Sequence, residues 1–312
     1  MKRFIVQIIF PITTAMIWGS SFVMQSNSAE VIEAMTFNAL RSVVAFLTLL
    51  LLIPIFRHFD KSEKPVQTPA EKKKSFKGLI WGGFCCGTAL ALACNLQQMG
   101  MVAGASAGKT SFITTLYVVL VPICGLFLKK KVPLSVWIGV MIAVAGLYCL
   151  CIKEDFSIVF SDFLVLLCAF AYALQILVID HFAPHNDGVQ LSCVQFFFTA
   201  IWSLIGMFVF ESPDWSAIMS CMGDILYVGI FSSGVAYTLQ ILAQKDSANP
   251  TMVSLLLSLE SVFGVLAGAI FLQERMSGKE YLGCVLMLIA VVLAQIPMPI
   301  KKKKAVAEYP NH

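Results

Sequence analysis

The chain has 312 residues, of which 58% are hydrophobic and only 13% are charged. Soluble domains have about a quarter of their residues charged, so this composition excludes a water-soluble globular protein. The formal net charge is +4, and the apolar residues extend over most of the length. These features indicate an all-α protein embedded in a lipid bilayer.

Apolar runs recur along the chain, each long enough to cross a hydrocarbon core of about 30 Å as a helix. In chain order they predict ten transmembrane helices, at residues 4–25, 35–56, 78–99, 104–128, 134–152, 160–180, 188–210, 222–243, 249–272 and 278–296. Lys2 and Arg3 imitate the start of a signal peptide, but the following run reaches Met24 and exceeds a signal sequence in length. We therefore expect this run to be retained as the first span.

The basic residues are distributed unevenly between the two faces of this arrangement. With a cytoplasmic N-terminus, 17 of the 22 lysines and arginines fall in cytoplasmic segments and three fall outside. The positive-inside rule therefore predicts that both termini are cytoplasmic. The basic linker 57–77 and the basic tail 297–312 follow from this topology, so we expect no nucleic-acid partner, although the linker could also bind anionic lipids.

Cysteine usage and glycosylation signals bound the class further. The ten cysteines lie almost all inside apolar runs, without C-x-x-C spacing, so we expect buried apolar residues and neither a metal site nor a cofactor. No N-x-S/T sequon is present, which favours a prokaryotic source. We accordingly expect a multi-pass protein of the bacterial cytoplasmic (inner) membrane.

The chain also matches itself at a fixed offset. A shift of 144 residues places Val118 on Val262 and Gly139 on Gly283. The further matches, at shifts of 143 to 154, are Gln97 on Gln240, Trp18 on Tyr172 and Arg41 on Gln195. We therefore predict two five-helix repeats, at residues 1–152 and 153–296. An odd number of helices inverts the second repeat relative to the first, as in many secondary transporters.

Four segments carry a family resemblance. They are I-W-G-S-S-F-V at 17–23, F-N-A-L-R at 37–41, S-A-G-K-T-S-F-I-T-T-L-Y-V-V-L-V-P at 106–122 and S-L-E-S-V-F-G-V-L-A-G-A-I-F-L-Q-E-R at 258–275. Over its full length the chain resembles the EamA-type ten-helix members of the drug/metabolite transporter superfamily. The resemblance implies export or uptake of amino acids, metabolites or amphipathic drugs without ATP. Ser261 replaces a proline of the family pattern, which puts in doubt any helix kink expected there.

Three ionisable residues lie within predicted spans, where a charge costs about 2.5–3.5 kcal/mol. Glu260 is at the middle of its span, either as a proton-responsive coupling group or as a carboxyl that satisfies neighbouring helices. Arg41 is closer to the outer surface, and we expect its side chain to extend there, with Glu30 and Glu33 as counterions. Lys109 is at a similar depth and could attract an anionic group of a substrate.

Uncharged polar and aromatic residues within the spans complete the candidate site. Together they could line a mostly apolar cavity with a few hydrogen-bonding groups, although each could also form a hydrogen bond between helices. With Lys109, the substrate-binding candidates are Trp18, Ser21, Asn95, Gln97, Thr114, Tyr117, Tyr172, Gln175, Ser233, Tyr237 and Gln240.

These patterns predict a secondary active transporter that exports a small molecule by alternating access, with proton coupling, as a monomer or homodimer. A non-transporting membrane subunit or sensor remains an alternative. A membrane-embedded enzyme is less favoured, because all four histidines lie in loops or the tail. Three residues, not four, separate Gly104 from the Gly-Lys-Thr at 108–110, so the chain has no Walker motif.

Overall fold

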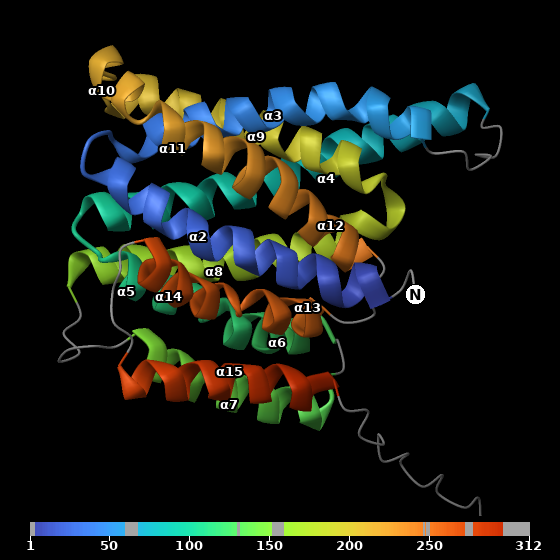
Figure 1. Cartoon of the computed structure of the whole chain (residues 1–312). Coiled ribbons are helices and arrows are strands. Elements are labelled where there is room, and N and C mark those ends of the chain that lie inside the picture. Colours follow the sequence, from blue (N-terminus) through green and yellow to red (C-terminus); the bar gives the residue numbers. More distant parts are fainter. Residues whose placement is uncertain are drawn as a thin grey trace, which may run out of the picture.

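The computed structural model describes residues 4–59, 68–129, 132–151, 159–245, 247, 250–271 and 277–295. These residues form helices joined by short connections and include no strand (Figure 1). The helices are η1 (Ile5–Ile9), α2 (Phe10–Ala29), α3 (Ala34–Phe59), α4 (Pro69–Val102), α5 (Ala107–Thr115), α6 (Tyr117–Phe127), α7 (Leu134–Cys151), α8 (Phe160–Phe182), η2 (Ala183–His185), α9 (Gly188–Phe210), α10 (Trp215–Ser220), α11 (Met222–Tyr227), η3 (Val228–Ala236), α12 (Tyr237–Lys245), α13 (Pro250–Leu257), α14 (Glu260–Phe271) and α15 (Gly278–Gln295).

Eight helical stretches of the described chain are long and apolar enough to cross a membrane. They correspond to predicted spans one to four and six to nine. The fifth and tenth spans correspond to shorter apolar helices, Leu134–Cys149 and Tyr281–Ala294. The all-helical membrane fold is therefore confirmed, whereas the count of ten spans stays a prediction.

The basic linker predicted at 57–77 is helical at both of its ends. Helix α3 continues to Phe59, and α4 already begins at Pro69. The early start of α4 has a local cause, because Thr68 and Glu71 form a reciprocal capping box. The rest of the linker and the tail 297–312 lie outside the described residues.

The helices pack in pairs that are distant in sequence. Helix α2 lies against α14, α3 against α9, α4 against both α8 and α9, and α7 against α15 (Figure 1). Many large apolar side chains, such as those of Leu51, Met141 and Phe208, are directed outward. Outward apolar side chains suit a lipid solvent, and the polar side chains are then buried between helices.

Two spans are interrupted near their middle. One is broken at Leu116, between α5 and α6, and the other at Ser258 and Leu259, between α13 and α14. At each break the backbone bonds tighten to three-residue spacing, as from Leu116 N to Ile113 O (3.2 Å) and from Leu259 N to Leu256 O (3.3 Å).

Hydroxyl groups next to the breaks form hydrogen bonds with the backbone of the preceding turn. Thr115 Oγ1 donates to Ser111 O at 2.7 Å, and Ser258 Oγ donates to Leu255 O at 2.7 Å. Such bonds from side chain to helix carbonyl often bend helices. The doubt raised by Ser261 is thus resolved, because the interruption is present although the family proline is missing.

Candidate functional site

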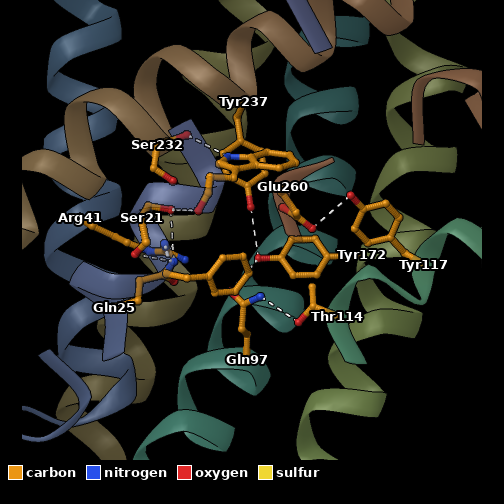
Figure 2. Close-up of a pocket in the computed structure, with 12 residues that line it drawn as sticks. Ser21, Gln25, Arg41, Gln97, Thr114, Tyr117, Tyr172, Ser232, Tyr237 and Glu260 are labelled. Carbon is orange, nitrogen blue, oxygen red and sulfur yellow. Dashed lines mark hydrogen bonds between the residues drawn. The ribbon is translucent and has the colours of Figure 1, made fainter. Parts of the chain in front are cut away.

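A small cavity lies where the interrupted spans meet α2, α3, α4, α8, η3 and α12 (Figure 2). Its volume is about 30 Å³, which is room for roughly two or three water molecules. The twelve lining residues are Trp18, Ser21, Phe22, Gln25, Arg41, Gln97, Thr114, Tyr117, Tyr172, Ser232, Tyr237 and Glu260. An organic molecule would therefore need the surrounding helices to move apart.

Glu260 is the acidic group of the cavity, and its side chain is 3% exposed. Its Oε1 accepts a hydrogen bond from Tyr117 OH at 3.2 Å and lies 3.1 Å from Thr115 Oγ1, whose single hydroxyl proton is shared with Ser111 O. Thr115 and Tyr117 flank the break at Leu116, while Glu260 itself begins α14. The carboxyl thus joins one interrupted span to the other, at a helix N-terminus whose dipole favours negative charge.

Arg41 is the basic group of the cavity and is also only 3% exposed. Its Nη1 donates to Gln25 Oε1 at 3.3 Å, and its guanidinium carbon lies 5.6 Å from the centre of the Phe37 ring. The prediction that Arg41 extends to the outer surface towards Glu30 and Glu33 is wrong. Glu33 instead accepts from Ser212 N. Among the described residues the guanidinium forms no ion pair with a carboxylate.

A chain of hydrogen bonds crosses the cavity between α12, α8, α4 and α5. Tyr237 OH donates to Tyr172 OH at 3.2 Å, and Tyr172 OH donates to Gln97 Oε1 at 3.3 Å. Gln97 Nε2 donates in turn to Thr114 Oγ1 at 3.1 Å. The residues are far apart in sequence, so this network depends on how the helices pack. It brings together four of the predicted site residues.

An aromatic wall, made by Trp18 and Tyr237 together with Phe22, lines the same space. The ring centres of Trp18 and Tyr237 are 4.7 Å apart. Trp18 Nε1 lies 3.4 Å from the backbone oxygen of Ser232 in η3, and donates to it. The two rings are tilted by 53° to each other, and aromatic faces of this kind suit a ring or an alkyl chain of a bound molecule.

Five of the predicted substrate-binding residues do not line the cavity. Asn95 bonds to Asn38 and Ser203, and Lys109 forms an ion pair with Asp162 at 2.7 Å. Gln240 Nε2 donates to Gln175 Oε1 at 3.3 Å, and Ser233 is buried within η3. These contacts connect helices to one another, and a role in substrate binding stays a prediction for all five.

Sequence reasoning left out four lining residues. Phe22 and Gln25 are one and two helical turns beyond Trp18, so the helical period of α2 could have identified them. Arg41 was recognised as ionisable but assigned to the surface. Ser232 lies in the π-helical segment η3, where a 3.6-residue period does not give the facing residue.

Comparison with known proteins identifies the family. The model of the EamA-like transporter family matches the chain in two stretches, residues 5–152 and 159–295. The chain belongs to the EamA-like transporter family. The resemblance noted from the four sequence segments is thereby confirmed.

Two further proteins are similar to this chain. An uncharacterized transporter of Archaeoglobus fulgidus is 29% identical over 287 residues, covering 90% of this chain and 83% of that protein. A protein of known crystal structure shares the fold, with a TM-score of 0.72 and 16% identity, over 93% of this chain and 96% of the other. Together with the apolar helices, the family indicates a multi-pass membrane transporter rather than an enzyme.

Proposed function

We propose that this EamA-like protein is a secondary transporter of a small metabolite, amino acid or amphipathic drug. It exports its substrate across the bacterial cytoplasmic membrane through the central cavity. The observation that carries the proposal is the buried cavity at the meeting point of two interrupted spans, with Arg41 and Glu260 in its wall. Interrupted helices that supply polar groups to a buried site are a recurring feature of secondary transporters.

The proposed architecture is ten spans in two inverted five-helix repeats, with both termini in the cytoplasm. The position of the breaks supports it, because Leu116 and Leu259, within the two interruptions, are 143 residues apart, which lies in the range of shifts of the sequence repeat. The packing also supports it. In the proposed repeat, α2 is equivalent to α8, and the span that contains α14 is equivalent to the span formed by α5 and α6. Helix α2 contacts α14, and α8 likewise contacts α5 and α6.

Alternating access requires the cavity to open to one face at a time, and the contracted cavity is a state closed to an organic substrate. Two contacts made by α8 could hold neighbouring helices together in the closed state. Lys109 of α5 pairs with Asp162 near the start of α8, and Gln240 of α12 bonds to Gln175 farther along α8. In the proposed topology the first contact is near the outer face and the second is in the inner half. Opening to one face and then to the other would therefore break them one after the other.

Glu260 is the proposed coupling group. Movement of the two interrupted spans would separate its carboxyl from Thr115 and Tyr117 and change its surroundings. A carboxyl whose environment differs between two conformations binds a proton with different affinity in each. A proton gradient can then drive the export of substrate in the opposite direction.

The test is a solute screen in proteoliposomes with an imposed pH gradient, repeated with Glu260→Gln. We expect the variant to lose gradient-driven accumulation and to keep exchange of labelled substrate at equal concentrations, because the amide retains shape without titrating. Glu30→Gln, at an exposed position, is the matched control and should behave as wild type. Accumulation with an unchanged pH profile in Glu260→Gln would refute the coupling role, and absence of any solute movement in the wild type would refute transport.

A further inference from the structure

The positive charge of Arg41 has no carboxylate partner among the residues that the structure describes. The guanidinium is permanently charged, buried and set within an apolar span, where an isolated charge is costly. Gln25 accepts one hydrogen bond from it, the thiol of Cys94 is a further hydrogen-bond partner, and Phe37 offers one ring face. Guanidinium carries five N–H donors, so the bond to Gln25 uses a small part of its capacity.

Within the described part of the chain, the other charged groups near the cavity do not supply a counterion. Glu260 contacts Thr115 and Tyr117 and forms no ion pair with Arg41. Asp162 lies against Lys109 and not against Arg41. Arg41 is also the sole cation among the twelve lining residues. The cavity wall therefore has one positive group in position to meet one negative group of a ligand.

The surroundings of Arg41 narrow the chemistry of that ligand. A single planar guanidinium matches a carboxylate with two parallel hydrogen bonds. A phosphate carries more charge and is usually met by several donors or cations, and the lining residues provide only Arg41 as a cation. The rings of Phe22, Trp18 and Tyr237 offer an apolar surface for the remainder of the molecule.

We propose that the cavity recognises organic carboxylates, with Arg41 binding the carboxylate and the aromatic wall contacting the apolar remainder. Gln25 is a positioning residue, because its amide oxygen fixes one edge of the guanidinium. The inference rests on the proposed function, since it names the substrate class of that transporter. It is nevertheless tested by binding alone, without any transport measurement.

The experiment measures binding to the purified full-length protein in lipid nanodiscs, by thermal shift and by calorimetry. The carboxylate probes are pentanoate, 3-phenylpropanoate and phenylalanine. The matched probes without a carboxylate are 3-phenylpropanamide and 2-phenylethylamine. We expect at least one carboxylate to bind and raise the Tm, whereas the amide and the amine leave it unchanged. No stabilisation by any carboxylate, or equal stabilisation by the amide, overturns the proposal.

Two variants separate ligand binding from a structural role of Arg41. Arg41→Gln should weaken carboxylate binding by about 30-fold or more, because the ligand loses its charged partner. Gln25→Glu keeps Arg41 and nearly the same shape but places a carboxylate where Oε1 now accepts from Nη1. This internal counterion should raise the Tm of the ligand-free protein. It should also compete with added carboxylates and weaken their binding about as much as Arg41→Gln does.

The outcomes separate this proposal from the proposed transport function. Should Gln25→Glu bind carboxylates as tightly as wild type, Arg41 would not contact them and the inference would be wrong, even if Arg41→Gln fails to fold. If the protein transports an amine and Gln25→Glu transports it equally well, the proposed transport function holds and the carboxylate proposal is wrong. If carboxylates bind in an Arg41-dependent way but no solute crosses the membrane, the carboxylate site holds and the proposed transport function is wrong.

Discussion

Replacing Gly19 by alanine should destabilise the protein, because α2 touches α14 at this residue. A Cβ atom on Gly19 would lie 2.6 Å from Gly264 N and 2.7 Å from Glu260 O. Both atoms belong to the backbone, so no side chain can rotate away, and the helices must separate. Overpacking of this kind costs about 1–3 kcal/mol, against a gain of up to about 1 kcal/mol from the better helix propensity of alanine.

Gly264→Ala is the matched control on the facing helix. Its Cβ would meet Gly19 O at 3.6 Å and Gly19 Cα at 3.9 Å, which is ordinary van der Waals contact. We expect this variant to match or slightly exceed the wild type in stability.

The assay is the apparent Tm of the detergent-solubilised protein at a fixed heating rate, because membrane proteins commonly unfold irreversibly. Gly19→Ala should lower it by a few degrees, at about 2–4 °C per kcal/mol. A Gly19→Ala protein as stable as Gly264→Ala would show that the close approach of α2 and α14 is not part of the folded state.

Two further predictions concern the ends of the helices and the threading. Glu211 accepts hydrogen bonds from Met35 N (2.7 Å), Thr36 N (2.6 Å) and Thr36 Oγ1 (2.8 Å), so Glu211→Gln should destabilise the fold by about 1–2 kcal/mol; an apparent Tm equal to wild type would contradict this cap. In the predicted topology, an impermeant thiol reagent applied to intact cells should label Ser157→Cys and not Ser62→Cys, in a background lacking accessible native cysteines, and the reverse pattern would refute the threading.

The helical membrane fold followed from the sequence because lipid imposes a single rule on every span. About 20 consecutive apolar residues must satisfy their backbone groups internally, so the runs could be counted without knowing how they pack. The eight spans identified by length and composition all correspond to predicted runs. The segments at 106–122 and 258–275 indicated the family for a similar reason, since they are local patterns.

Part of the site was also accessible from the sequence. Trp18, Gln97, Tyr172 and Glu260 stood out as polar or amphipathic groups in apolar spans, and all four line the cavity. Depth along a span can be read from residue number at 1.5 Å per residue. The direction in which a side chain faces around the helix axis cannot be read from residue number where a span is interrupted, as at Leu116, or π-helical, as in η3.

Packing between distant helices decided the rest. Lys109 and Arg41 have similar depths in the sequence, yet Lys109 is paired with Asp162 on α8 whereas Arg41 is enclosed beside Gln25 on α2. The sequence around each residue does not distinguish them, because the helix that lies opposite decides whether a counterion is present. The sequence alone placed ionisable residues within the predicted spans. Only the tertiary structure decided which of them lies in the wall of a cavity without a carboxylate partner among the described residues.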